Sequence, residues 1–397
     1  MTIINQNNKN SAPPLKFKSF STTTVDSYEA GIEMGEALKE IQPEVILLFA
    51  SIYYDFTELF EAIYSSLGTE DVIIFGGTGD GVYETERVVN NGVAALAING
   101  GKKIGWSMAI RTDANLDPFY SAQECAREVL SQSKSPINLA FVFADKSCDG
   151  VKIVEGVGDV LNVPFIGGLT GDDWQFKKGF IFCNGQLYEN AVGILGMSGA
   201  FSFAINTASG WKPMGKSGIV EESHDNIVGY IDGKTAFNFL EEQFGIPVSE
   251  ASLGVFPLAV YESEQSDRFF LRTSDKIFMA SGEVSYFGSI KIGTTVRVCN
   301  ATNDDVVAGV NDAITGIGTL SFEPACAIVI SCGARKWMLG ERVKEETSRL
   351  FDVLGKKLPL VGFPSFGEMG PIHCENGSYT PVFFHNVSYV ALLLGPS

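Results

Sequence analysis

One arrangement of elements recurs three times along the chain, and it limits the possible folds more than any other feature. It consists of an apolar strand, a helix, a second apolar strand with a glycine-rich loop, and two closing strands. The first copy has its apolar strand at 45–51 and its glycine-rich segment at 72–81, and the second has them at 139–145 and 163–173. A third, more degenerate copy occupies 326–394. Short apolar runs without polar alternation are typical of strands buried on both faces. The sequence therefore predicts a mixed α/β fold of duplicated strand–helix–strand–hairpin units, with helices covering the sheets.

Each copy is expected to end in a β-hairpin. In the first copy, two apolar strands at 93–98 and 104–110 flank the sequence Asn-Gly-Gly at 99–101. An Asn-Gly sequence between apolar runs is a strong hairpin signal, because asparagine and glycine tolerate the positive φ of a tight turn. The second copy repeats the pattern at 191–207.

A strand-rich stretch at 269–299 separates the second copy from the third. Helices are predicted on either side of it, at 232–245 and 304–317, and Gly245 is expected to end the first of them. We place the main boundary near residue 235. The predicted parts are a polar, mobile N-terminal arm and lead-in at 1–39, an N-terminal domain with two copies at 40–235, and a C-terminal domain with the third copy and the strand-rich insert at 236–397.

Composition and charge exclude several classes of protein. Hydrophobic residues make up 45% of the 397-residue chain and charged residues 19%, which is too apolar for a disordered acidic chain. The formal net charge of −18 argues against nucleic acid or an anionic membrane as the main partner. The sequence has neither an apolar run long enough to span a bilayer nor a secretory signal, so we expect a soluble, cytoplasmic protein with reduced thiols.

Acidic residues follow glycine in all three glycine-rich loops, as Asp80, Asp172 and Glu368. Such loops allow a close approach of the backbone to a ligand, and an acid repeated at one place can hold an ammonium group or accept hydrogen bonds from a polar ligand. The alternative is a tight turn closed by an Asx-type side-chain bond. The loops do not match the phosphate-binding patterns of nucleotide sites. We therefore expect the ligand site where the loops of different copies converge, at the strand ends.

Two further residues are candidate ligand contacts. Trp211 lies in the glycine-rich segment 209–220, where its ring can stack on a ligand or anchor a loop that crosses between domains. Arg335 follows the apolar strand of the third copy, and its guanidinium fork suits a carboxylate.

The cysteines and histidines give weaker predictions. Cys148 and Cys332 follow apolar strands, so they are either structural residues or nucleophiles of a thiol-dependent enzyme. The seven cysteines include no CxxC pair, and no pair of the three histidines has metal-ligand spacing, so we expect neither a disulfide framework nor a metal site. A single haem-ligating histidine stays open, and His385 is the candidate.

Segments from about residue 40 to the C-terminus resemble the FIST family, a bacterial intracellular sensory module with an N-terminal and a C-terminal half. In chain order they are LFASIYYDF, IFGGTGDG, FIGGLTGDD, SGWKPMGKSGIV, SCGARKWMLGER, LVGFPSFGEMGPI and FFHNVSYVALLLG. The resemblance implies two FIST subdomains and a sensor of small ligands, with amino acids proposed as ligands for the family. Some FIST-type proteins are haem-based nitric oxide sensors that act on histidine kinases.

The favoured hypothesis is a cytoplasmic sensor that binds a small polar ligand without turnover and relays this to a separate signalling protein such as a histidine kinase. An amino acid is one candidate ligand, and pairing as a homodimer is compatible with a sensory module. The expected ligand contacts are Asp80, Asp172, Trp211, Arg335 and Glu368, with no catalytic residue. The alternatives are a haem-binding nitric oxide sensor with His385 as ligand, an enzyme with a nucleophilic cysteine, and an interaction scaffold with a vestigial pocket.

Overall fold

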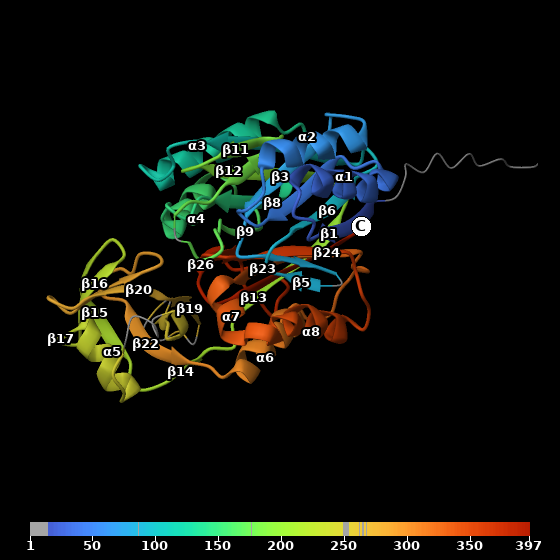
Figure 1. Ribbon diagram of the computed structural model, residues 1–397. Helices are drawn as coiled ribbons and strands as arrows, with labels where there is room; N and C mark the ends of the chain where they lie inside the picture. Colours follow the sequence, from blue (N-terminus) through green and yellow to red (C-terminus); the bar gives the residue numbers. More distant parts are fainter. Residues whose placement is uncertain are drawn as a thin grey trace, which may run out of the picture.

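The computed structural model describes residues 15–85, 87–175, 177–248, 254–261, 263, 266 and 268–397. Figure 1 shows a large body that contains the blue, green and red segments of the chain. A smaller body, coloured yellow to orange, is joined to it.

The large body is built on three six-stranded sheets. The first sheet has the order β1 (Lys16–Thr22), β6 (Val93–Asn99), β2 (Val45–Ala50), β3 (Ile73–Thr78), β10 (Ile181–Cys183) and β11 (Gln186–Tyr188). The second has β7 (Ile104–Arg111), β12 (Val192–Gly199), β8 (Ile137–Ala144), β9 (Phe165–Leu169), β25 (Glu368–Gly370) and β26 (Phe383–His385). The third has β13 (Ser202–Ala208), β27 (Tyr389–Gly395), β23 (Cys326–Cys332), β24 (Leu360–Ser365), β4 (Val82–Glu84) and β5 (Arg87–Val89).

The three sheets share one plan and exchange strands in a ring. Each has a central parallel pair, β2/β3, β8/β9 or β23/β24, that comes from one copy of the repeat. Each also accepts two short strands from another copy: the first sheet takes β10 and β11, the second takes β25 and β26, and the third takes β4 and β5. The exchange is cyclic, so the copies form a pseudo-threefold body in which the ends of all three parallel pairs meet.

The predicted closing hairpins are wrong. β6 pairs with β1 and β2 in the first sheet, whereas β7 pairs with β12 in the second. Likewise β12 belongs to the second sheet and β13 to the third. Both edges of β6 are already occupied, so the turn at 99–101 carries the chain to another sheet. The Asn99 side chain donates hydrogen bonds to the carbonyls of Ile41 and Gln42, each at 2.7 Å. These bonds hold the turn against the short helical segment that ends just before β2.

Helices cover the outer faces of the sheets, as predicted. Their apolar faces complete one buried cluster with each sheet. The pairs are α1 (Ser27–Leu38) with α2 (Phe56–Leu67) on the first sheet, α3 (Pro118–Gln132) with α4 (Gly150–Val160) on the second, and α6 (Asn303–Thr315) with α8 (Glu345–Leu354) on the third. Three short elements complete the list: η1 (Lys39–Ile41), α7 (Gly333–Leu339) and η3 (Gly340–Lys344).

From Lys16 onward, the segment predicted as a polar arm and lead-in at 1–39 contains a strand and a helix; residues 1–14 lie outside the described residues. β1 pairs along its whole length with β6, and α1 packs on α2. Gly31 of α1 makes this packing possible, because a Cβ there would lie 2.5 Å from the Leu59 carbonyl oxygen.

The inner faces of the three sheets meet in one apolar core. At its centre Phe49, Phe143 and Phe363 contact one another, with ring centroids 4.5 to 5.8 Å apart. These residues lie at or near the carboxyl ends of strands from all three copies. The core therefore fixes the loops that follow those strands relative to one another.

The smaller body, which we call the lobe, holds a nine-stranded antiparallel sheet and, among its described residues, the single α-helix α5. The predicted strand-rich stretch at 269–299 is confirmed, and so is the end of the helix at Gly245, which has φ 67°. Strands on both sides of residue 235 share this sheet, so the predicted domain boundary does not separate two bodies in space. The elements are β14 (Lys212–Pro213), β15 (Gly218–His224), β16 (Ile227–Ile231), β17 (Lys234–Thr235), α5 (Ala236–Phe244), β18 (Leu258–Tyr261), β19 (Phe269–Arg272), β20 (Ser274–Phe278), β21 (Glu283–Tyr286) and β22 (Thr295–Asn300).

Candidate functional site

The glycine-rich loops of the three copies converge, as expected, at the carboxyl ends of the parallel pairs. We call this place the loop junction, made of residues 78–82, 169–175 and 365–368. In each loop the N–H at one equivalent position donates to the backbone of another copy, so the three form a closed ring, and Leu169 N adds a further bond to Gly367 O (2.9 Å). The bonds run from Gly171 N to Thr78 O (2.8 Å), from Phe366 N to Leu169 O (3.3 Å) and from Asp80 N to Pro364 O (3.0 Å).

The ring corrects the alignment of the repeated acids. The three donors, Asp80, Gly171 and Phe366, occupy equivalent positions, and only one of them is acidic. Asp172 and Glu368 come one and two positions later in their own loops. The acids therefore do not share one structural place, because the loops differ in length, and each acid has its own surroundings.

Asp80 has the most unusual surroundings of the three. Its side chain is fully buried, and Oδ1 accepts a hydrogen bond from the Trp174 backbone N–H at 3.3 Å. Oδ2 has no hydrogen-bond partner among the described residues. Burial raises the pKa of the Asp80 carboxyl to about 7, although the nearby Lys336 ammonium favours ionisation. Lys336 also donates to the Asp80 backbone carbonyl.

Gly333 leaves the space into which Asp80 Oδ2 points. A Cβ at position 333 would lie 2.8 Å from Oδ2 and 3.6 Å from Cζ2 of Trp174. A side chain there would displace the carboxylate or the tryptophan ring. The glycine that follows β23 therefore brings the backbone of the third copy against the acid of the first.

Asp173 and Trp174 form a strained corner beside Asp80. Both have positive φ, at 53° and 60°, in the left-handed region that a bulky residue rarely adopts. The Trp174 side chain is 41% exposed, and its ring lies edge-on to Phe366 at 5.9 Å. Asp173 Oδ2 accepts a hydrogen bond from the Ile52 N–H, and burial raises the pKa of this carboxyl to about 6.

Asp172 closes its own loop. Its Oδ2 lies 2.6 Å from the Lys146 ammonium, and it accepts backbone hydrogen bonds from Lys177 and Lys178 at 2.6 and 3.0 Å. A carboxylate with three such donors holds the loop in place. The loop-closing alternative from the sequence describes Asp172 better than a ligand contact does.

Glu368 is also satisfied by the protein. Oε1 accepts from Ser365 Oγ at 2.9 Å, and Oε2 accepts from the Ser388 N–H and Oγ at 3.0 and 2.8 Å. Burial raises the pKa of the Glu368 carboxyl to about 7.

The two candidate nucleophilic cysteines are buried. The Cys332 thiol lies against the Glu368 carboxylate, and burial together with this carboxylate raises the pKa of Cys332 well above its usual value. Burial likewise raises the pKa of Cys148 to about 12. Neither cysteine is in surroundings that favour a nucleophilic thiolate.

Arg335 and Trp211 do not lie in the loop junction, and a ligand role for them does not fit their contacts. Arg335 is fully buried, with Nε 2.7 Å from Glu346 Oε1 and Nη2 2.9 Å from the Val306 carbonyl. Diverting it to a ligand would leave a buried carboxylate unpaired, which is strongly destabilising. Trp211 is 3% exposed and donates its Nε1–H to the Val255 carbonyl at 2.9 Å, so it anchors the loop into the lobe.

His385 does not fit the role of a haem ligand. It is 4% exposed, and its Nε2 lies 3.0 Å from the Gly370 carbonyl. Burial lowers its pKa to about 4, so the ring is neutral and its Nε2 donates to that carbonyl. An axial ligand needs a free ring nitrogen that faces a haem-sized space.

The sequence did not identify Asp173, Trp174 or Lys336. A tryptophan directly after Gly-Asp-Asp was a signal for the first two. Nothing in the sequence distinguished Lys336 from Arg335 beside it. Which of the two side chains faces the loop junction depends on how the helix that carries them packs in the third copy.

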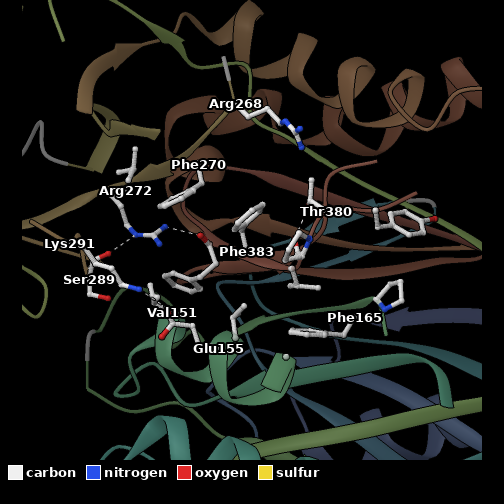
Figure 2. Close-up of a pocket in the computed structure, with 18 of the residues that line it drawn as sticks. Val151, Glu155, Phe165, Arg268, Phe270, Arg272, Ser289, Lys291, Thr380 and Phe383 are labelled. Atoms are coloured by element: carbon white, nitrogen blue, oxygen red, sulfur yellow. Dashed lines mark hydrogen bonds and ion pairs between the residues drawn. The ribbon is translucent and has the colours of Figure 1, made fainter. Parts of the chain in front are cut away.

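Two hollows are candidate binding spaces, and one of them borders the loop junction. A crevice of about 400 Å³ borders the loop junction at Phe366, and its other walls include Lys146, Lys177 and Lys178. A larger cavity of about 1230 Å³ lies between α4, the lobe and the segment 379–384, as Figure 2 shows.

No group of three potential ligand residues that could hold a metal ion occurs in the described part of the chain. None of the helices described is long and apolar enough to cross a membrane.

Comparisons with known proteins give two family matches that together cover most of the chain. The FIST N domain matches residues 44–234, and the FIST C domain matches residues 236–371. An uncharacterized protein of Methanocaldococcus jannaschii is 25% identical over 219 residues, which are 52% of this chain and 42% of that protein. The match therefore spans less than half the length of that relative.

Solved structures give only distant likenesses. A cyanuric acid hydrolase from A. caulinodans has a TM-score of 0.36 at 9% identity, over 96% of this chain and 99% of that one. PurLQS from Thermotoga maritima has a TM-score of 0.23 at 12% identity, over 96% and 72% of the two chains. Values this low support no conclusion about fold or activity.

Proposed function

Because the chain belongs to the FIST family, whose domains are associated with the sensing of small ligands in signal transduction, we propose that it binds a compact, amino-acid-like ligand at the loop junction and relays this to a separate protein. In this proposal the protein binds its ligand without turnover. A cytoplasmic location remains a prediction from the sequence.

The observation that carries the proposal is the unpartnered Oδ2 of Asp80. A buried polar atom without a hydrogen bond costs about 1–3 kcal/mol, and more when it is charged. Folded proteins leave few such atoms, and each one calls for an explanation. A ligand ammonium group would supply both the missing donor and a compensating charge.

The charges around Asp80 favour a ligand that also carries a negative group. The Lys336 ammonium interacts with both Asp80 and Asp173. The adjoining crevice adds Lys177, whereas Lys178 lies 3.3 Å from Glu189, which also lines the crevice. An α-amino acid presents an ammonium and a carboxylate a few bonds apart, which matches the Asp80 carboxylate with the Lys336 ammonium beside it.

The strained corner at Trp174 is the part of the site that we expect to change on binding. A left-handed tryptophan costs of order 1–3 kcal/mol and persists only while its surroundings hold it. A ligand that binds Asp80 changes the acceptor of the Trp174 N–H directly. The half-exposed indole then carries this change to the surface, where a partner such as a histidine kinase can read it.

A thermal-shift screen tests the proposal. The twenty amino acids and a set of small organic acids are added at millimolar concentration, and the unfolding temperature is recorded. A ligand at 100 times its Kd stabilises the native state by about 2.7 kcal/mol, so the true ligand gives a clear rise. Stabilisation that is lost in Asp80→Asn and kept in the exposed-acid control Glu323→Gln supports the site. The absence of any stabilising compound would contradict the proposal.

The geometry favours neither the haem sensor nor the thiol-dependent enzyme. A haem sensor needs His385 free, and a thiol enzyme needs a reactive Cys148 or Cys332, whereas all three are buried.

A further inference from the structure

The larger cavity has walls from both bodies of the molecule. In Figure 2, Val151 and Glu155 of α4 lie on one side, Phe383 on a second, and Phe270, Arg272 and Lys291 of the lobe on a third. The cavity shares no lining residue with the loop junction.

Arg272 is the unusual residue in this wall. Its side chain is 2% exposed, yet it forms no ion pair with any carboxylate that the structure describes. The guanidinium carbon lies 4.4 Å from the ring centroid of Phe270 and 5.4 Å from that of Phe384. Nη1 donates to the carbonyls of Phe384 (2.7 Å) and Leu271 (3.1 Å). Nε donates to the Ser289 carbonyl at 3.5 Å.

A buried guanidinium held in this way is prepared for an anion. Two aromatic faces and three carbonyls fix its plane, but carbonyls do not neutralise its charge. Asp149 and Glu155 act on it only from a distance, and Glu155 is 3.2 Å from Lys291. Burial lowers the pKa of Arg272 to about 9, so the group keeps its charge at neutral pH. The charge lacks a close counter-ion.

The remaining walls define the rest of the ligand. Among the lining residues that the structure describes, Arg268 and Lys291 add two cations, and Glu155 is the one carboxylate. Phe165 and Phe383 contribute apolar surface. This excess of cations among the described lining residues contrasts with the net charge of −18 of the whole chain. The cavity therefore combines an apolar chamber with a fixed cationic end.

We propose that this cavity is a second binding site, which takes an organic anion with an apolar body and places the anionic head against Arg272. Its walls come from α4 of the second copy and from the lobe, so an occupant contacts both bodies at once. The site is independent of the amino-acid-like ligand proposed for the loop junction.

A fluorescence titration with 1-anilinonaphthalene-8-sulfonate tests the proposal, because this probe is an aromatic anion whose emission rises in an apolar site. Its neutral analogue N-phenyl-1-naphthylamine has the same ring body without the sulfonate. The folded protein is expected to bind the anionic probe at one site and the neutral analogue at least tenfold more weakly. Octanoate and benzoate should both compete, and inorganic phosphate should compete poorly because it lacks the apolar body. Equal binding of the two probes would overturn the choice of an anion.

Gly158 of α4 allows the cavity to be blocked without a clash. It lines the cavity, and a Cβ at this position has no neighbouring atom within 4 Å. Gly158→Phe is expected to weaken the anionic probe at least tenfold, while Gly158→Ala leaves it unchanged. Identical affinities in these two variants would place the probe elsewhere and refute the site.

The exposed cations provide a test that does not depend on the folding of a cavity-filled variant. Arg268→Gln and Lys291→Gln are each expected to weaken the anionic probe about threefold. Lys276→Gln, an exposed change on the neighbouring strand β20, is the matched control and should bind normally. No loss in either cavity variant would contradict the proposal. Asp80→Asn should bind the probe like the wild type, so failure here is distinguishable from failure of the loop-junction ligand.

Discussion

Replacing Asp80 by asparagine should change how the stability of the protein depends on pH. The asparagine keeps the size of the side chain and cannot ionise. In the wild type, burial raises the pKa of the Asp80 carboxyl from 3.8 to about 7. Between these pH values the native state holds a proton that the unfolded chain has released. The free energy of unfolding of the wild type therefore falls as the pH rises from about 4 to about 7, and this contribution of Asp80 is absent in the variant.

The magnitude follows from the size of the shift. A change from 3.8 to about 7 is about three pKa units, and at 1.36 kcal/mol per unit it corresponds to at most about 4 kcal/mol. Asp173 and Glu368 also have raised pKa values, but both are present in the two proteins, so most of their effect cancels in the difference. The free energy of unfolding of Asp80→Asn minus that of the wild type should increase between pH 4 and pH 8 by several kcal/mol, with about 4 as the upper limit.

Urea unfolding at pH 4, 5, 6, 7 and 8 measures this difference. Glu323→Gln serves as the control: its side chain is 85% exposed, and because the Lys356 ammonium lowers the Glu323 pKa, any effect of this replacement on the pH profile has the opposite sign. Parallel profiles for the wild type and Asp80→Asn, within about 0.5 kcal/mol, would refute the reasoning, since they would mean that Asp80 ionises as freely in the folded protein as in the unfolded chain.

Three other outcomes follow from the structure. Arg335→Ala should destabilise the protein by about 3–5 kcal/mol in urea unfolding, because it leaves the buried Glu346 carboxylate unpaired; a loss below about 1 kcal/mol would contradict this. Cys148 and Cys332 should resist labelling by a thiol reagent at pH 7 while the protein is folded, and rapid modification of either would show that its thiol is accessible and reactive. Added haemin should give no Soret band that depends on His385, and a band lost in His385→Ala would overturn our placement of that residue.

The sequence predicted the local elements of the fold well, because apolar runs and helical spacing report burial directly. It could not predict which strands become neighbours. The turn at 99–101 has the residues that a tight β-hairpin requires, yet β7 joins another sheet because β1 and β2 already pair with the two edges of β6. The exchange of β4, β10 and β25 among the sheets likewise depends on the assembled body. Such pairings between distant parts of the chain leave no trace in local patterns.

The candidate site was predicted in location but not in detail. The loops converge where the ends of parallel strands were expected to meet. Asp80, Asp172 and Glu368 looked equivalent because each follows a glycine, but only the ring of backbone bonds reveals their different positions. Arg335 looked available for a ligand because its partner Glu346 lies on a helix 11 residues away, and a buried ion pair between elements is not visible in either segment alone.

Calorimetric titration of the wild type and Asp80→Asn with an amino acid that stabilises the protein tests the central claim most directly. The account predicts one site per chain in the wild type and binding at least tenfold weaker in the variant, with Glu323→Gln unchanged. Equal affinity in the wild type and Asp80→Asn would contradict the claim that the unpartnered carboxylate at the loop junction holds the ligand.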